Sequence, residues 1–160
     1  DLPRLVFLDE LTTGLDPSAR REIWTYIKEL QDEGRTIVMT THYMEEAALL
    51  CDEICLFNQG EIVAQGTVDE VIAQADIDLV ISFETDGDVA NILEGLPRAR
   101  HIEHDGRLVN IYTNTEQTLT DLILRLNEGG IVYRRIKITY PELEDAFLKL
   151  VNSTTKGAVS

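Results

Sequence analysis

The chain has 160 residues, of which 44% are hydrophobic, and its formal net charge is −15 at pH 7. A chain of this length can bury one large core or two small ones. Because the acidity repels phosphate backbones and anionic headgroups, and no Lys/Arg stripe with interleaved aromatic residues occurs, we expect neither nucleic acid binding nor direct lipid binding. No apolar run reaches the length needed to cross a bilayer.

The start of the chain joins a short apolar run to two adjacent carboxylates. Residues 5–8 are apolar, and Asp9 and Glu10 follow them. The run predicts a strand buried on both faces, with the carboxylates at its C-terminal end, where open parallel α/β sheets bind their ligands. One such carboxylate can hold Mg²⁺ while its neighbour orients or deprotonates a water. The same pattern also occurs without any catalytic role, so the sequence that follows must decide.

A helix and a second strand come next. Asp16 precedes a proline and predicts the N-cap of a helix that ends at Gly34. Residues 36–40 predict a second buried strand, which is followed by His42. If the two strands run parallel through a right-handed crossover, the carboxylate pair and the imidazole lie close together.

Other polar side chains in this half are assigned structural roles. Glu45 and Glu46 open a helix and do not complete a metal-binding pattern, so we expect a solvated acidic first turn that the helix dipole favours. Cys51 and Cys55 have apolar neighbours and no metal-site spacing, and we expect both to be buried, reduced thiols.

Beyond these elements, the sequence predicts a hairpin and then a mixed α/β region. Residues 53–66 predict a β-hairpin, and beyond residue 76 the order is strand, helix, strand, strand, helix, strand. This order is the ferredoxin-like split βαβ pattern. Its clearest local signal is Asp105-Gly106 between two extended runs, a dipeptide typical of two-residue hairpin turns.

Three spaced motifs in the first half resemble those of ABC-transporter ATPases. Residues 5–10 look like the Walker B strand, residues 13–16 (Thr-Gly-Leu-Asp) like the D-loop, and Thr41-His42 like the switch-histidine loop. The acidic helix at residues 141–150 resembles the closing segment of exporter-type members that carry a small accessory domain. The resemblance implies an α/β fold: the C-terminal part of a P-loop ABC ATPase domain, followed by a small ferredoxin-like α+β domain.

The resemblance also assigns roles to individual residues. It implies that Asp9 holds Mg²⁺ through water, that Glu10 activates the attacking water and that His42 contacts the γ-phosphate of ATP. Gly14 and Asp16 fall in the D-loop, on the nucleotide side of the site, and Asp16 would reach a partner ATPase domain. On local grounds Asp16 is also an ordinary N-cap, and a histidine at a strand end is often hydrogen-bonded scaffolding, so these structural interpretations stand beside the functional ones.

The chain departs from the family pattern in two respects. Leu11 stands where the family usually has Pro after the catalytic Glu, which leaves this turn less constrained. No Gly-x-x-x-x-Gly-Lys-[Ser/Thr] loop and no Ser-Gly-Gly signature occur among the 160 residues. We therefore expect the C-terminal piece of a longer protein, which alone binds ATP poorly and hydrolyses none measurably.

These inferences predict three regions: residues 1–75 from the ATPase domain, residues 76–151 as an accessory or regulatory domain and residues 152–160 as a flexible tail. The expected function is that of the ATP-hydrolysing subunit of an ABC exporter, with ATP and Mg²⁺ as cofactors. Its expected partners are a second ATPase domain in a homodimer and integral-membrane permease subunits, which hold it at the cytoplasmic face of the membrane. The alternatives are a non-enzymatic regulatory or dimerisation module and an ABC-type ATPase of DNA repair, although the sequence lacks the coiled coil or basic groove that the latter predicts.

Overall fold

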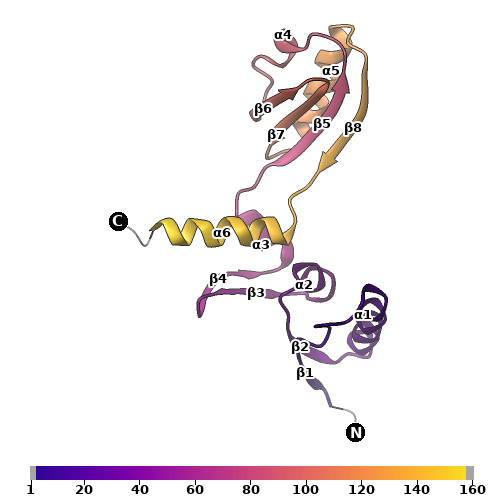
Figure 1. The fold of residues 1–160 in the computed structure, drawn as a ribbon, viewed down its shortest axis with the longest axis vertical. Helices are drawn as coiled ribbons and strands as arrows, with labels where there is room; N and C mark the ends of the chain where they lie inside the picture. Colours follow the sequence, from indigo (N-terminus) through magenta and orange to yellow (C-terminus); the bar gives the residue numbers. More distant parts are fainter. Residues whose placement is uncertain (1–2, 158–160) are drawn as a thin grey trace. The chain divides into compact units, whose positions relative to one another are not determined.

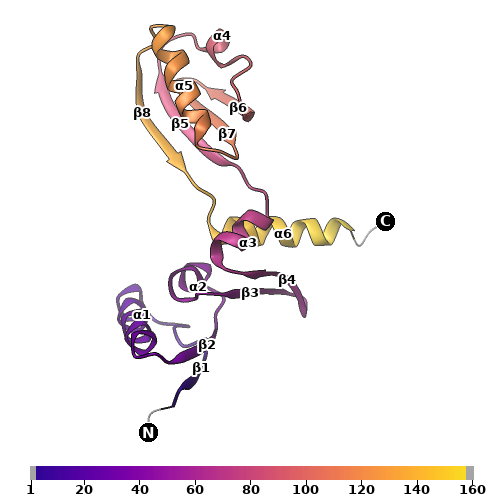
Figure 2. The same cartoon turned by 180° about the vertical axis from the view of Figure 1, so that it is seen from behind.

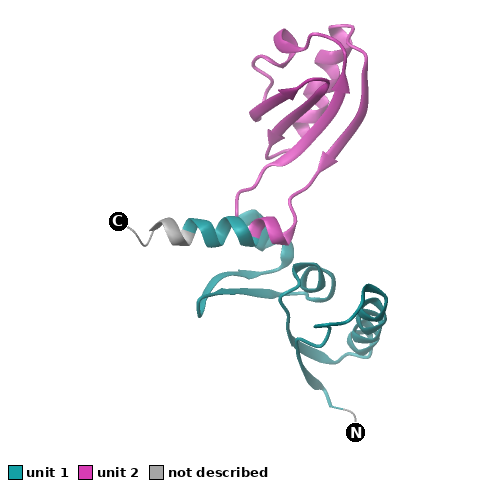
Figure 3. Ribbon diagram, viewed as in Figure 1, with its two compact units in different colours: residues 1–74, 147–160 teal, residues 75–146 magenta. Residues whose placement is uncertain are grey.

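The computed structural model describes residues 3–157. The chain divides into two compact units, residues 1–74 with 147–160 and residues 75–146 (Figure 3). Within the described range, no helix combines the length and the apolar character that crossing a membrane requires.

The first unit begins with a parallel strand pair. Strands β1 (Leu5–Asp9) and β2 (Thr36–Thr40) pair in parallel, and helix α1 (Pro17–Asp32) connects them (Figure 1). Trp24 and Ile27 of α1 are buried, and the inner side chains of the two strands pack against them. The predicted strand–helix–strand order is confirmed, and it brings the C-terminal ends of both strands to one edge.

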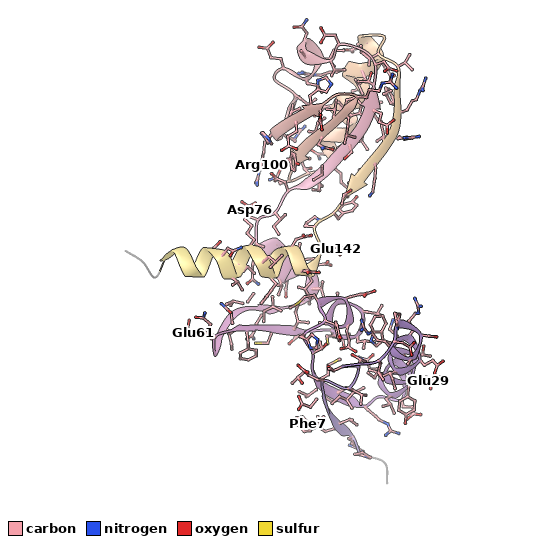
Figure 4. All side chains as sticks on the ribbon, viewed as in Figure 1. Phe7, Glu29, Glu61, Asp76, Arg100 and Glu142 are labelled. Carbon is pink, nitrogen blue, oxygen red and sulfur yellow. The ribbon has the colours of Figure 1, made fainter. Side chains whose placement is uncertain are left out.

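The prediction that these strands are buried on both faces is wrong for this chain. Phe7 (Figure 4) is 72% exposed, Leu5 is 48% exposed and Val38 is 47% exposed. Side chains alternate between the faces of a strand, and α1 covers only the face that carries the other residues. A continuous apolar run therefore does not show whether one face of a strand or both faces are covered.

The predicted hairpin follows helix α2 (Met44–Leu50). Strands β3 (Ile54–Asn58) and β4 (Glu61–Gly66) pair in antiparallel fashion, and helix α3 (Val68–Gln74) comes next. Thr67 and Glu70 form a capping box at the start of α3: each side chain accepts a hydrogen bond from the other residue's backbone N–H, at 3.3 and 2.9 Å.

The two cysteines differ from each other in exposure. Cys51 is partly buried, and burial, with the nearby charges of Asp52 and Glu46, raises the pKa of its thiol. Cys55 lies on the outward face of β3 and is exposed, so the expectation that it is buried is wrong. Both are free thiols.

The second unit is a four-stranded antiparallel sheet with two helices. Its elements are β5 (Leu79–Thr85), α4 (Ala90–Leu93), β6 (Ala99–Asp105), β7 (Leu108–Thr113), α5 (Gln117–Glu128) and β8 (Tyr133–Thr139). The spatial strand order is β6-β7-β5-β8, and α5 lies along one face of the sheet (Figure 2). The buried side chains between sheet and helices include Phe83, Ile111 and Leu122. The chain order of strands and helices is the predicted one.

Two local details in this unit refine the sequence analysis. Asp105 still pairs with Leu108, so the two turn residues are Gly106 and Arg107, one position later than expected. Gly106 has φ +61°, a conformation that favours glycine and explains why the turn is placed there. At the other end of β6, Arg100 lies 3.0 Å from a carboxylate oxygen of Asp76 (Figure 4).

The last helix, α6 (Leu143–Gly157), begins just after Pro141. The backbone N–H of Glu142 donates to the Asp145 carboxylate at 2.8 Å, a contact that stabilises the start of the helix. Helix α6 includes residues 152–157, where the sequence analysis expected a flexible tail, and residues 158–160 lie outside the described part of the chain.

Candidate hydrolytic site at the strand ends

The candidate site begins where β1 and β2 end. Asp9 and Thr40 are the last residues of the two strands and are partners in the parallel register. The Thr40 hydroxyl donates a hydrogen bond to Asp9 Oδ1. The backbone N–H of Glu10 donates to the Thr40 carbonyl at 3.0 Å and to the Thr40 hydroxyl at 3.2 Å. Thr40 therefore ties both carboxylate residues to the end of the neighbouring strand.

Glu10 has an unusual backbone conformation. Its φ is +45°, in the left-handed region that side-chain-bearing residues rarely adopt. The Glu10 carbonyl accepts a hydrogen bond from the N–H of Thr13 at 3.0 Å, so a tight turn follows the strand directly. Backbone strain of this kind concentrates at functional sites, where the surrounding contacts maintain it.

The Glu10 carboxylate meets two side chains from different segments. Its Oε1 lies 3.3 Å from His42 Nδ1, and its Oε2 accepts a hydrogen bond from the Thr13 hydroxyl at 3.2 Å. The side chains of Glu10 and His42 are 49% and 53% exposed. The carboxylate is thus held on both oxygens and is still accessible to water.

Aromatic and cationic neighbours support His42. The ring of Tyr43 lies 4.1 Å from the imidazole, centroid to centroid, and the guanidinium carbon of Arg20 lies 4.0 Å from the Tyr43 ring centroid. The Tyr43 N–H also donates to the Thr41 hydroxyl at 3.0 Å. A stack from α1 through Tyr43 therefore restricts the orientation of the histidine.

Close to this stack lies a buried carboxylate that the sequence analysis placed in solvent. Glu46 is only 1% exposed, and its Oε1 accepts a hydrogen bond from the indole N–H of Trp24 at 2.8 Å. The expectation of a solvated Glu46 is wrong, because the face of α2 that carries this residue turns towards Trp24 on α1. Glu45, its neighbour in sequence, is exposed as expected.

The two D-loop residues lie in the connection between Glu10 and α1. Asp16 is the N-cap of α1, and its carboxylate accepts hydrogen bonds from the N–H groups of Ser18 and Ala19. These hydrogen bonds lower the pKa of Asp16 below its usual value, and the bond from Ala19 has the largest effect. Gly14 has φ +80°, which a glycine adopts readily. The structure thus brings Asp9, Glu10 and His42 together, and among the described residues Asp16 has no contact with that group.

The donor chemistry of the site suits Mg²⁺. Carboxylates and hydroxyls at the strand ends supply the hard oxygen ligands that this ion prefers. Within the described range, no cluster of three or more His, Cys, Asp or Glu side chains is spaced to hold a metal by itself. Mg²⁺ usually takes only one or two carboxylates and completes its shell with water and substrate phosphates, so Asp9 fits a role as a single protein anchor.

Sequence reasoning did not assign functional roles to Thr40 and Thr13. Thr40 could have been found from the parallel register, since the last residue of the second strand faces the carboxylate that ends the first. The contact of Thr13 with Glu10 depends on the turn that the positive φ of Glu10 creates, and no sequence pattern signals that conformation in a glutamate.

Comparisons with known proteins show what this chain is similar to. A family described as "AAA domain, putative AbiEii toxin, Type IV TA system" matches residues 1–46, which include Asp9, Glu10 and His42. The Nod factor export ATP-binding protein I of Rhizobium meliloti (strain 1021) is 38% identical over 160 residues, which is 96% of this chain and 44% of the relative.

Two further relatives are also named ATP-binding proteins. The Nod factor export ATP-binding protein I of Bradyrhizobium sp. (strain SNU001) is 40% identical over 92% of this chain and 47% of its own length. The daunorubicin resistance ATP-binding protein DrrA3 of Streptomyces coeruleorubidus is 34% identical over 92% of this chain and 48% of its own length.

A solved structure titled "Structure of ATP binding subunit of ABC transporter" aligns with a TM-score of 0.41 and 32% identity, over 45% of this chain and 30% of that one. The chain spans about half the length of the curated relatives it matches. By sequence, over most of its length, this chain is a homologue of ABC-transporter ATP-binding subunits.

Proposed function

We propose that this chain carries the hydrolytic half of the ATPase site of an ABC exporter. The proposal rests on one observation. The side chains of Glu10 and His42 lie 3.3 Å apart, beside Asp9, at the C-terminal ends of two parallel strands. Ligands of open α/β sheets bind at this edge, and hydrolysis of a phosphoanhydride needs a carboxylate, an electrophilic donor and a metal anchor there.

In this proposal Glu10 orients and deprotonates the attacking water. Its carboxylate is half exposed, so a water can reach it, and the Thr13 hydroxyl and the His42 ring restrict its rotation. A positioned base of this kind typically contributes a rate factor of about 10² to 10⁴.

His42 acts as the donor to the terminal phosphate. When the imidazole is protonated, both ring nitrogens donate, so Nδ1 is bonded to Glu10 while Nε2 is free to donate to a phosphate oxygen. The Tyr43 ring and Arg20 hold the imidazole in the orientation that this double contact requires.

Asp9 would hold Mg²⁺ through a water ligand, and Thr40 fixes the carboxylate that does so. The ion supplies charge neutralisation at the phosphates when it is bound with ATP. Gly14 and Asp16, which lie in the connection between Glu10 and α1, would form the D-loop contact with a second ATPase domain.

The proposed setting is a homodimer of ATPase domains that drives integral-membrane permease subunits at the cytoplasmic face of a membrane. The names of the two relatives described as Nod factor export ATP-binding protein I support export as the direction of transport. We propose that residues 75–146 form a ferredoxin-like accessory domain, which the strand order β6-β7-β5-β8 and the two helices support.

The test needs a protein in which this chain is joined to a Walker A-containing segment, because no such loop occurs among these 160 residues. In that protein Glu10→Gln is expected to lower ATP turnover by about 100-fold or more with Mg-ATP affinity unchanged. Glu29→Gln, on the exposed face of α1 (Figure 4), is the matched control and should turn over at the parental rate. Parental turnover of the Glu10→Gln variant would refute the proposal.

A further inference from the structure

The unit formed by residues 75–146 contains a hollow that the ATPase proposal does not use. It has a volume of about 460 Å³ and is lined by residues 84–87, residues 130–132, Arg107 and Arg134. These segments are the end of β5 with its following loop, the β6–β7 turn, the loop between α5 and β8, and the start of β8. The volume falls in the range of small-molecule sites. We propose that this hollow binds a small organic anion that carries an apolar group.

The walls of the hollow are held together by one buried residue. Thr85 is 6% exposed, and its backbone N–H donates to the carbonyl of Arg107 at 2.9 Å. Its hydroxyl donates to the Val132 carbonyl at 2.9 Å and accepts from the N–H of Gly87 at 3.0 Å. Because three separate segments are fixed through Thr85, the hollow is formed before any ligand arrives, which lowers the entropic cost of binding.

The charges around the hollow leave one cation without a partner. Asp86 pairs with Arg107 at 2.6 Å, and Glu84 pairs with Arg135 at 2.8 Å, so both lining carboxylates are neutralised. Arg134 also lines the hollow, and among the residues that the structure describes it has no ion-pair partner. The unpaired guanidinium in an otherwise neutral lining selects for an anion, and its planar fork suits a carboxylate.

A β-bulge places this arginine. Between the pairs Ser82–Lys137 and Glu84–Arg134, β5 advances by two residues and β8 by three, so β8 carries one extra residue. Arg135 lies within the bulge and has φ +55°. Bulges redirect neighbouring side chains and recur next to binding sites. Here Arg135, within the bulge, pairs with Glu84, while Arg134 lines the hollow.

The remaining wall is apolar. Val132 is 73% exposed, and Ile131 lies next to it along the lining. A Cβ atom on Gly87 would lie 3.0 Å from Ile131 Cδ1, so glycine at this position lets the Ile131 side chain pack closely against the loop after β5. A ligand with an apolar group attached to its carboxylate would contact the exposed valine with the apolar group and the unpaired arginine with the carboxylate.

The test uses the 160-residue chain and two probes that share the phenylpropyl skeleton and differ in their end group, the anionic phenylpropionate and the neutral phenylpropanol. Titration is followed through the backbone amide NMR signals of Gly87, Gly130 and Val132. We expect saturable shifts at these amides with phenylpropionate, and affinity about three- to fivefold weaker with the neutral alcohol, since Arg134 is exposed and a solvent-screened charge contact is worth about that factor.

Two variants complete the experiment. Arg134→Gln should weaken phenylpropionate binding by about three- to fivefold and leave phenylpropanol unaffected. Lys137→Gln removes a charge from the same strand outside the hollow and should change neither affinity. The proposal is overturned if those amides do not shift saturably, if both probes bind equally well, or if Arg134→Gln binds phenylpropionate as the parent does.

Discussion

At the scale of single residues, the backbone of Glu10 is the feature most specific to the site. A residue with a Cβ atom in the left-handed region costs about 1–2 kcal/mol, and glycine avoids most of this cost. Glu10→Gly is therefore expected to be more stable than Glu10→Ala by about 1 kcal/mol in urea unfolding followed by the fluorescence of Trp24, the single tryptophan.

Glu29 provides the control for this comparison. It lies within α1, where glycine is less favourable than alanine by about 1 kcal/mol, so the order of the two substitutions should be reversed there. Equal stabilities for the Glu10 pair would show that the strained conformation does not persist in solution.

The buried Glu46 makes a second prediction. Glu46→Ala leaves the buried indole N–H of Trp24 without an acceptor, and we expect the free energy of unfolding to fall by about 2 kcal/mol. Glu46→Gln keeps an oxygen for the indole and should cost less. The exposed Glu45→Ala is the control with no expected change, and an equally small effect at position 46 would contradict the buried contact.

Asp16 makes a prediction about pH. Hydrogen bonds from Ala19 and Ser18 hold its pKa below the usual 3.8, so the charged form stabilises the folded state. That contribution is complete above the pKa of the unfolded chain and is lost as the pH falls through the lowered pKa of the folded chain.

Melting temperatures measured across the acid range test this. Asp16→Asn retains the cap without titrating, so its melting temperature should fall less steeply with acid than that of the parent. Asp16→Ala should melt a few degrees lower at neutral pH, because the cap itself is lost. A parental acid profile for Asp16→Asn would exclude the carboxylate as a titrating cap.

At the scale of elements, Thr40 joins the ends of the two parallel strands. Thr40→Val removes the donor to Asp9 and the side-chain acceptor for Glu10 N–H, and we expect a loss of about 1 kcal/mol in unfolding free energy. In the ATPase-competent longer protein, turnover should fall as well. Thr40→Ser should restore both properties, and Thr36→Val at the other end of β2 should change neither.

The sequence predicted elements better than it predicted their surroundings. Local signals were sufficient for α1, where Asp16 caps the helix as expected, and for the β3–β4 hairpin. The exposure of Phe7 was not predictable, because an apolar run does not reveal which neighbours cover it. The burial of Glu46 depends on Trp24, 22 residues earlier in the chain, and such a contact leaves no local pattern.

The same distinction applies to the candidate site. The order of the motifs and the rule for parallel crossovers predicted that Glu10 and His42 would meet, and the structure places them in contact. The supports of the site were not foreseen: the parallel register would have pointed to Thr40, whereas the Tyr43 stack and the Thr13 contact depend on side-chain and backbone directions that topology alone does not specify.

At the scale of the whole molecule, the two proposed sites lie in different units. The strand ends that carry Glu10 belong to the first unit, and the hollow lined by Arg134 belongs to the second. The two proposals therefore fail separately: loss of phenylpropionate binding would leave the catalytic assignment standing, and parental turnover of Glu10→Gln would leave the anion site standing.

The most direct test of the central claim is a double-mutant cycle between Glu10 and His42, measured as ATP turnover in the longer protein that supplies the Walker A loop. If the two side chains form one catalytic unit, Glu10→Gln and His42→Ala should each lower turnover by about 100-fold, and the double variant should be little slower than either single variant. Losses that multiply, so that the double variant is about 10⁴-fold slower, would show two independent residues and contradict the account.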